Sequence, residues 1–479
     1  MAPDGDDRRR LTRMPRQGAI VAVLSVAGLA SSFMFTLVVP IQSKLPELLG
    51  ASREDTAWVV TATLLAAAVF TPIAGRLGDM YGKRRIVLVL LALLVVGSII
   101  AAVSPGIVGV IVGRALQGAV TGVVPLGISI MRDVLHEDRI DAAIAFMSAT
   151  LGVGGAIGMP VSAIITETSD WHVLFWMSAG LGVIVFALVV WIIPPSVLRT
   201  AGRFDYIGAA GLAVGLTGVL LAISRGNEWG WASPATLACG LGGIAVLLVW
   251  GWYELRLSEP LLDLRVAARP AVLLTNLASV AVGFSLFASN VSYPQMLELP
   301  AAAGGFGLSL LQASLIVMPS GLVMMVLSPF SGRLARTVGP QLLLVLGAAA
   351  LIVAYGYSLL FASEVWHILV ANLLIGVGIG FGYAAMPMLI MRSVPPTETG
   401  ASNGLNALFR SLGTSTAAAL VGAVLAAMSV TRDGVAVPTP AAFQTSFALG
   451  IGAAAVALAI ALFIPRRRDP HEMHPSLPH

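Results

Sequence analysis

The sequence predicts an all-α integral membrane fold with 14 transmembrane helices: two six-helix bundles, two extra central helices between them, and both termini in the cytoplasm. Apolar residues make up 57% of the chain and charged residues only 11%, whereas roughly a quarter of a typical soluble domain is charged. Apolar runs of about 20 residues, each long enough to cross a bilayer, recur along the chain. The second half of the chain also repeats motifs of the first.

These proportions exclude a soluble enzyme of ordinary type. The net charge of +4 does not indicate nucleic-acid binding, because the cations lie in short loops between apolar runs. The single cysteine, Cys239, lies inside an apolar run, so we expect neither an intrachain disulfide nor a metal cluster. The sequence shows no clustered acids, histidines or nucleophile typical of an intramembrane enzyme and no phosphate-binding loop. We therefore expect no enzyme activity, no metal site and no cofactor.

The predicted order begins with a cytoplasmic tail (1–18), whose arginines precede a retained first helix rather than a cleaved signal peptide. An N-terminal six-helix bundle (19–200), two linker helices (201–270), a C-terminal six-helix bundle (271–465) and a second cytoplasmic tail (466–479) follow. The predicted spans cover residues 19–39, 57–74, 86–103, 107–130, 142–165, 173–193, 207–223, 235–253, 271–289, 308–329, 341–361, 368–391, 401–428 and 443–464.

The distribution of basic residues supports this count. Most of the 28 Lys and Arg residues fall in loops that a cytoplasmic amino terminus places inside, as the positive-inside rule requires. Arg225 is assigned to an outside loop, and Arg114 and Arg410 are assigned to spans. A miscounted span would invert every later loop, so the asymmetry supports an even number of spans.

The most informative loop joins the second and third spans, where Gly75–Arg85 reads GRLGDMYGKRR. One acid, four cations and three glycines cannot lie in hydrocarbon, so this stretch is a tight loop at a membrane face. Glycine lets backbone segments approach where a side chain would hold them apart. The sequence therefore predicts close packing here, on the cytoplasmic side.

An internal repeat relates the two halves. GRLGDMYG at Gly75 returns as GRLARTVG at Gly332, ISIMR at Ile128 is echoed by LIMR at Leu389, and Thr-Leu-Gly at Thr150 is echoed by Ser-Leu-Gly at Ser411. The spacing is similar in all three cases, which indicates one duplicated six-span unit. Parallel repeats of this kind are a transporter design in which substrate binds between the halves near the midplane.

These residues resemble the major facilitator superfamily, and specifically its fourteen-helix drug:proton antiporter branch. GRLGDMYGKRR matches the superfamily's loop motif, and IVGRALQGAVTG from Ile111 resembles its fourth-helix motif. GGAIGMP from Gly154 resembles the fifth-helix antiporter motif, although Met159 is inserted before the proline. FDYIGAAGL from Phe204 and EPLLDLRV from Glu259 resemble the extra central helices.

The resemblance implies a secondary active transporter that exports hydrophobic or amphiphilic small molecules by alternating access, in exchange for protons, as in multidrug resistance. It implies a multi-pass protein of the plasma membrane with no cofactor, because the proton gradient supplies the energy. The implied partners are a small-molecule substrate and the lipid bilayer, with no nucleic acid, no obligate protein partner and a monomeric state.

For the loop, the resemblance implies a gating role for Gly75, Asp79, Gly82, Lys83, Arg84 and Arg85. Asp79 is expected at the start of the thirteenth span, near Gly400, where a helix dipole favours an acid. That contact would hold the cytoplasmic side shut. The alternative is a plain loop acid paired with Arg84 or Arg132. The second copy has Arg336 where Asp79 would stand, so the contact is expected to be asymmetric.

Two cations are predicted inside spans, where a charge is expensive and is a functional hypothesis by default. We interpret Arg114 and Gln117, together with Arg410, as a polar network for proton coupling. The alternative is that Arg114 bonds backbone carbonyls and braces neighbouring helices. Arg410 shares one helix face with Asn403 and Asn406, which predicts that this face meets the central cavity or a neighbouring helix.

The first helix departs from the branch. The branch usually carries an aspartate there, but FMFTLVVPIQSKLP places Met34 at about that position. The usual proton-carrying carboxylate is therefore missing. An alternative function is the same fold exporting or facilitating a neutral or anionic metabolite or a lipid. A membrane sensor or enzyme is the remote alternative.

The remaining candidates are apolar or small residues. Gly154 and Gly158 form a small-xxx-small pattern that allows close helix contact, and Pro160 can kink the span. We interpret the three as a packing motif that limits leak. A substrate cavity is predicted from side chains for which ordinary packing is the alternative: Phe33, Met34, Phe35, Tyr383, Met386, Asn403 and Asn406.

Overall fold

The computed structural model describes residues 17–465, apart from residues 43, 197, 201, 302–303 and 433–434. The predicted carboxyl-terminal tail (466–479) and all but the last two residues of the predicted amino-terminal tail (1–18) lie outside the described residues. Within the described part, 14 helices are long and apolar enough to cross a membrane, which confirms the predicted count.

The first half of the chain forms six spans, and the fourth is built from three consecutive helical pieces. Its elements are α2 (Gln17–Thr36), the short α3 (Leu45–Leu49), α4 (Arg53–Tyr81), α5 (Lys83–Val103), α6 (Ile107–Gly118) with η1 (Ala119–Gly122) and α7 (Val123–Val134), α8 (Glu137–Thr168) and α9 (His172–Ile192). The two linker spans are α10 (Tyr206–Trp229) and α11 (Pro234–Glu254), followed by the short α12 (Leu264–Ala267).

The second half repeats the pattern. Its elements are α13 (Pro270–Glu298), α14 (Leu310–Val317) with α15 (Pro319–Val338), α16 (Pro340–Phe361), α17 (Val365–Ser393), η3 (Pro396–Glu398), α18 (Thr399–Ala427) and α19 (Pro440–Phe463). Strands β1 (Ser429–Arg432) and β2 (Val435–Pro438) form an antiparallel hairpin between α18 and α19, with Ser429 opposite Pro438.

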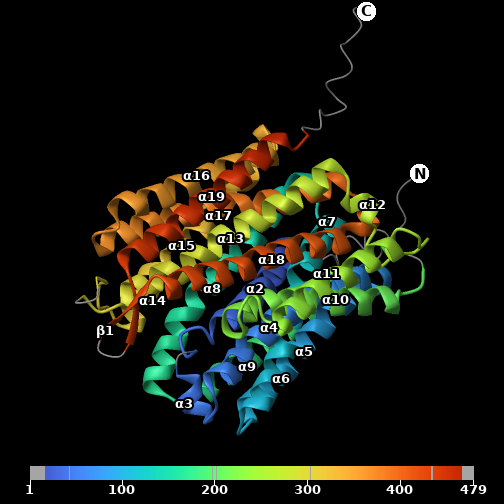
Figure 1. Ribbon diagram of the computed structural model, residues 1–479. Helices are drawn as coiled ribbons and strands as arrows, with labels where there is room; N and C mark the ends of the chain where they lie inside the picture. The colour runs from blue at the N-terminus through green and yellow to red at the C-terminus, as the bar shows by residue number, and fades with distance from the viewer. Residues whose placement is uncertain are drawn as a thin grey trace, which may run out of the picture.

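The bundle has two distinct ends (Figure 1). We call the end that carries the Gly75–Arg85 stretch and α12 the basic end, and the end that carries α3, α14 and the β-hairpin the hairpin end. Which end faces the cytoplasm remains a prediction from the basic loops.

Several helices run beyond the predicted spans, because polar caps extend them past the apolar run. Ser52 caps α4 by accepting a hydrogen bond from the Asp55 backbone N–H (3.0 Å), as short polar residues do at helix starts. Two assignments were wrong. α10 continues to Trp229, so Arg225 lies on a helix near the hairpin end and not in a loop. The Gly75–Arg85 stretch is helical except at Gly82, because α4 continues to Tyr81 and α5 begins at Lys83.

The duplication is visible in the backbone. The loop glycine Gly82, between α4 and α5, has a φ of 103°, and its repeat counterpart Gly339, between α15 and α16, has a φ of 88°. Residues other than glycine rarely adopt a positive φ. Pro72 inside α4 and Pro329 inside α15 also stand at matching positions. The two halves therefore share a helix–proline–glycine–helix unit.

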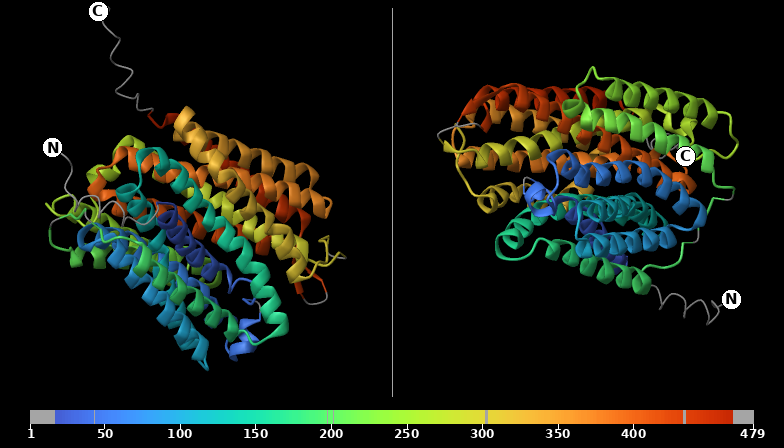
Figure 2. Two further views of the ribbon diagram at one scale, coloured as in Figure 1. Left: turned by 180° about the vertical axis from the view of Figure 1, so that it is seen from behind. Right: turned by 60° about the horizontal axis from the view of Figure 1, so that its bottom comes forward.

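The halves meet along two helix pairs, α4 with α18 and α8 with α15, and one large apolar cluster extends through both halves. Views from three directions show the two bundles side by side (Figures 1 and 2). The linker helix α10 packs on both α4 and α18, with α11 against it. The linker pair therefore covers one of the two places where the halves touch.

The predicted packing motif on α8 lies against α2. A Cβ on Gly154 would stand 2.6 Å from the Leu29 carbonyl oxygen, and one on Gly158 would stand 2.0 Å from Thr36 Oγ1. The obstacle at Gly154 is backbone, which cannot move aside. Pro160 is buried in the same helix, which continues to Thr168. The structure thus brings α2 and α8 into contact at both glycines, and a role in limiting leak stays a prediction.

Replacing Gly154 with leucine is expected to lower the unfolding temperature of the purified protein. Overpacking of a tight helix contact costs about 1–3 kcal/mol, and here the α2 backbone must shift. The matched control is Gly180→Leu on α9, where nothing lies within 4 Å of the new Cβ. Thermal unfolding in detergent checks this. Equal unfolding temperatures for the two variants would contradict close packing at Gly154.

Candidate functional site

Asp79, the acid of the Gly75–Arg85 stretch, lies near the end of α4 and contacts the start of α18, in the other half. Asp79 is 1% exposed. Its Oδ1 accepts a hydrogen bond from the Gly400 N–H (3.1 Å) and its Oδ2 accepts one from the Ala401 N–H (2.8 Å). These are backbone donors at a helix N-terminus, which lack partners inside the helix and favour a negative charge. This is the contact that the resemblance implied.

Glycine makes this contact possible. A Cβ on Gly75 would stand 2.4 Å from the Gly400 carbonyl oxygen, and a Cβ on Gly400 would stand 2.7 Å from Asp79 Oδ1. The two helices therefore touch backbone to backbone at this point. Larger residues at either position would separate the halves or displace the carboxylate.

The three cations at the start of α5 do not share the contact that Asp79 makes with α18. Lys83 is buried and pairs with Asp133 of α7, with Nζ 2.6 Å from Oδ2. The Arg84 side chain donates to the Val190 carbonyl oxygen (2.5 Å), and Arg85 is exposed. Lys83 and Arg84 thus fix the loop to its own half. Arg84 does not pair with Asp79.

Arg132 of α7 crosses to the second half instead of pairing with Asp79. It donates to Thr399 Oγ1 (2.6 Å) and to the Val394 carbonyl oxygen (3.2 Å). Arg392 of α17 forms an ion pair with Asp141 of α8 (2.9 Å). These contacts add to that of Asp79 at the basic end. Asp79, Arg132 and Arg392 thus each make a polar contact between the halves at this end of the bundle.

The second copy of the repeated motif makes a corresponding contact, from the second half to the first. Arg336, the counterpart of Asp79, lies near the end of α15 and donates to the Asp138 carbonyl oxygen (2.8 Å), in the first turn of α8. Glu137 and Asp138 make that turn acidic, which suits a cation. Each half thus sends one charged residue to a helix start of the other half, and the two charges are opposite.

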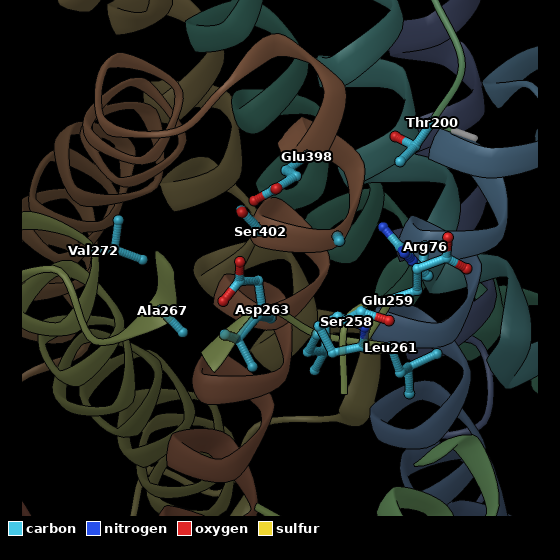
Figure 3. Close-up of a pocket in the computed structure, with 14 residues that line it drawn as sticks. Arg76, Thr200, Ser258, Glu259, Leu261, Asp263, Ala267, Val272, Glu398 and Ser402 are labelled. Carbon is cyan, nitrogen blue, oxygen red and sulfur yellow. The ribbon is translucent and has the colours of Figure 1, made fainter. Parts of the chain in front are cut away.

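The segment between α9 and α10 also contacts both halves at this end. Thr200, after α9, donates its backbone N–H to the Asp79 carbonyl oxygen (2.7 Å) and its hydroxyl to the Thr397 carbonyl oxygen (2.9 Å). Beside it lies a pocket of about 180 Å³, lined by both halves and by linker residues 258–267. Figure 3 shows Arg76, Asp263, Glu259 and Glu398 around this pocket.

Arg114 is buried among neutral groups. It is 2% exposed and donates to the Met34 carbonyl oxygen (3.0 Å) and to Gln117 Oε1 (2.9 Å), and lies 3.1 Å from the Met34 sulfur. Gln117 in turn donates to Ser98 Oγ (2.7 Å). No carboxylate pairs with Arg114 in the described part of the chain. The predicted Arg114–Gln117 network is present, together with the carbonyl contacts of the alternative interpretation.

The Met34 contact has a local cause. Met34 lies in the last turn of α2, where carbonyl groups lack partners inside the helix. A cation near a helix C-terminus is favourable, so Arg114 caps α2 from α6. The position that carries an aspartate in the resembled branch therefore presents its backbone and its thioether to the arginine.

The second half has its own polar cluster. Asn406 donates to Asn276 Oδ1 (3.0 Å) and to Ser279 Oγ (2.6 Å) on α13, and Ser279 also lies 2.7 Å from the Met386 sulfur. The Arg410 guanidinium stands over the Tyr383 ring, 4.8 Å from its centroid. Asn406 thus makes a helix contact, one of the two predicted settings for this face.

The predicted cavity residues divide between the two halves of the structure. Tyr383, Met386, Asn406 and Arg410 lie around α13, α17 and α18. Asn403, on α18, donates to the Thr399 carbonyl oxygen (2.9 Å), one turn earlier on its own helix. Phe33 packs in a separate apolar cluster from Met34, which Phe35 adjoins. The substrate cavity stays a prediction.

Comparison with known proteins decides the family. The sequence profile of the Major Facilitator Superfamily matches residues 24–418 and, in a second match, residues 278–478. The chain belongs to the major facilitator superfamily. As a member it is a transporter and not an enzyme.

Relatives in this superfamily have named roles in resistance. The chain is 25% identical over 462 residues to the lincomycin resistance protein LmrB of Listeria monocytogenes, covering 94% of this chain and 97% of that protein. It is 25% identical over 472 residues to the multidrug resistance protein Stp of Mycobacterium tuberculosis, covering 96% and 86%. The solved structure of the human organic anion transporter MFSD10 shares the fold, with a TM-score of 0.65, 14% identity, and coverage of 94% of this chain and all of that one.

Sequence reasoning missed one buried cation of this superfamily member. Arg225 is 2% exposed, donates to the Glu54 carbonyl oxygen (3.1 Å) and stands over the Trp58 ring at 4.5 Å. It also pairs with Glu228. Two residues along, Asn227 donates to the Ala419 carbonyl oxygen of α18 (2.9 Å). The signal was the polar run RGNE between apolar and tryptophan-rich stretches, which extends the helix rather than ending it.

Proposed function

We propose that this transporter exports hydrophobic or amphiphilic small molecules by alternating access and takes its energy from the proton gradient. The observation that carries the proposal is the contact of Asp79 with the start of α18. It is a pair of buried hydrogen bonds between the two halves at one end of the bundle, which separation of the halves would break. The resistance roles named for LmrB and Stp support the substrate class.

The geometry supports a cycle of two states. Polar contacts that cross between the halves at the basic end come from Asp79, Arg132, Arg336 and Arg392. Opening that end exchanges these hydrogen bonds for hydrogen bonds with water, so the net free-energy cost of each is only about 0.5–3 kcal/mol. A substrate bound between the halves then needs only a modest difference in affinity to bias the equilibrium.

We place the protein in the plasma membrane as a monomer, with both termini in the cytoplasm and the basic end inside. The basic loops support this orientation through the positive-inside rule. The implied partners are the substrate and the lipid bilayer, without an obligate protein partner, nucleic acid or cofactor.

A second candidate keeps the fold and changes the coupling: export or facilitation of a neutral or anionic metabolite or lipid without a first-helix carboxylate. The observation that favours it is Arg114, buried against Met34 and Gln117 with no acid as partner in the described residues. A fixed positive charge between α2, α4 and α6 disfavours cationic substrates and suits neutral or anionic ones.

The experiment has two steps. Cells with and without the protein are first challenged with a panel of toxic compounds, and we expect higher tolerance for amphiphilic compounds. A compound to which the protein gives tolerance is then tested in proteoliposomes that contain a pH indicator. Proton movement opposite to the compound supports the first candidate. Transport without proton movement supports the second, and no transport of any such compound would contradict both.

A further inference from the structure

Two acids face each other where the linker helices begin and end. Asp205 is the N-cap residue of α10, and Glu254 is the last residue of α11. Glu254 is 2% exposed. Both lie at the basic end, beside the pocket of Figure 3, because Leu262 lines that pocket and donates its backbone N–H to Glu254 Oε2 (3.3 Å).

The two carboxyl groups approach across a glycine. Asp205 Oδ2 lies 2.1 Å and Glu254 Oε1 lies 2.3 Å from the position that a Cβ on Gly208 would occupy. The two oxygens are therefore neighbours in the space that Gly208 leaves free. Both oxygen atoms are buried and neither has a hydrogen-bond partner.

The other oxygens of the pair are already bonded. Asp205 Oδ1 accepts from the Gly208 N–H (2.9 Å) and from the Tyr253 hydroxyl (3.3 Å), and Glu254 Oε2 accepts from Leu262. Two facing carboxylate oxygens without a donor between them repel each other, and a shared proton removes both the repulsion and the two unmet acceptors.

The surroundings offer no compensating cation. The charge that acts on Glu254 is that of Asp205, and the donors beside its carboxyl group are neutral: the Trp250 indole N–H and the backbone N–H groups of Leu261 and Leu262. Tyr253 is the other titratable group in contact with the pair. On the surfaces of α4 and α18 that pack against α10, the cluster is apolar, with Ala68, Leu405 and Leu408 among its members.

The remaining charged groups at this end are engaged elsewhere or lie around the pocket. The Glu259 carboxylate accepts from the Arg203 N–H (2.8 Å), and Asp263 caps α12. Arg76 and Glu398 line the pocket and interact electrostatically with each other. None of these groups bonds to either oxygen that faces Gly208, among the residues that the structure describes.

We propose that Asp205 and Glu254 form a proton-binding site, in which one proton is shared between Glu254 Oε1 and Asp205 Oδ2. The proton resides on Glu254. Asp205 stands at a helix N-terminus, where a negative charge is favoured, and Glu254 stands at a helix C-terminus, where it is disfavoured. The hydroxyl of Glu254 then donates to Asp205 Oδ2, and every oxygen of the pair is bonded.

The site ties the linker to the interface between the halves. Its proton joins the start of α10 to the end of α11, and α10 packs on both α4 and α18. Loss of the proton leaves two negative charges side by side, which pushes the linker helices apart where they cover that interface. The inference concerns proton binding by the folded protein and does not depend on the proposed export.

The test is infrared spectroscopy on the purified full-length protein in detergent, at neutral pH, in H₂O and D₂O. The wild type is expected to show the exchange-sensitive band of a protonated carboxyl group. E254Q is expected to lose intensity equal to one such group, because its amide donates to Asp205 as the acid did. The matched control E259Q, an acid of the same linker with an ordinary backbone donor, is expected to keep that intensity.

A second measurement follows the unfolding temperature from neutral to alkaline pH. The wild type is expected to lose stability as the pH rises, because the folded protein must release the shared proton. E254Q is expected to show a smaller fall. An unchanged band in E254Q, an equal loss in E259Q, or identical pH dependence of E254Q and wild type would each overturn the assignment.

Discussion

Asp79→Ala is expected to reduce the transport rate of a compound that the wild-type protein transports by one to two orders of magnitude. The change removes two hydrogen bonds between a carboxylate and backbone N–H groups and leaves the Gly400 and Ala401 donors buried without a partner. Hydrogen bonds to charged groups contribute about 1.5–3 kcal/mol each, and about 1.4 kcal/mol changes an equilibrium tenfold. The balance between closed and open basic ends should therefore shift strongly toward open.

A measurement that needs no substrate is available, because Cys239 is the only cysteine in the sequence. In a Cys239→Ser background, Ser402→Cys introduces a single thiol at a buried position that lines the pocket between the halves. Asp79→Ala is expected to raise the reaction rate of that thiol with a soluble reagent at least tenfold.

The matched control for this prediction is Asp170→Ala at the opposite end. The His172 backbone N–H bonds to Asp170 (2.8 Å) and lowers the pKa of that carboxyl, so it too is an ionised acid with a backbone donor, but it contacts its own half. Labelling and transport should both match the parent protein. If the introduced thiol reacted no faster in Asp79→Ala than in this control, the contact would not hold the basic end closed.

Arg114→Met is expected to abolish transport while changing the unfolding temperature little. The variant loses the cap on α2 and the bond to Gln117. It also removes a buried charge without a counter-ion, whose desolvation costs several kcal/mol. The lost hydrogen bonds lower stability and the removed desolvation cost raises it, so the two effects on the unfolding temperature oppose each other. Methionine cannot replace the positive charge that we expect transport to require. A fall in unfolding temperature with transport retained would instead show that Arg114 only braces the helices.

Met34→Asp extends this prediction. The Met34 sulfur lies 3.1 Å from an Arg114 nitrogen, so an aspartate there is placed to pair with the arginine. We expect Met34→Asp to be tolerated with Arg114 present and to destabilise the Arg114→Met variant by about 3–5 kcal/mol, the cost of an unpaired buried charge. A double-mutant cycle on purified proteins measures this coupling. Met34→Leu, which carries no charge, should show none.

The span count and the duplication were predictable because both depend on local sequence. Apolar length decides whether a helix crosses a bilayer, and the Gly82 and Gly339 loops carry the same glycine for the same positive φ. The contact of Asp79 with Gly400 came from the resemblance, since nothing local to the loop names its partner 321 residues away.

Other features required the folded chain. Arg225 fell outside a predicted span because its charge ends an apolar run, although its pairing with Glu228 and Trp58 keeps it on a buried helix. Asp205 and Glu254 read as ordinary helix-end acids until α10 and α11 pack and bring their oxygens together beside Gly208. In both cases the residues show no functional signal in the sequence, and only the folded chain brings them together.

The mirrored contacts at the basic end also bear on the surrounding lipid. Two identical copies of the loop would place the same charge at both contacts, and a change in surface potential would strengthen or weaken both together. Here a negative Asp79 and a positive Arg336 contact the two helix starts. Anionic lipids change the potential at a cytoplasmic membrane surface by tens of millivolts, and opposite charges respond to it in opposite directions. With the proposed mechanism and orientation, divergence of the two copies therefore makes closure of this end less sensitive to membrane composition than a symmetric pair would be.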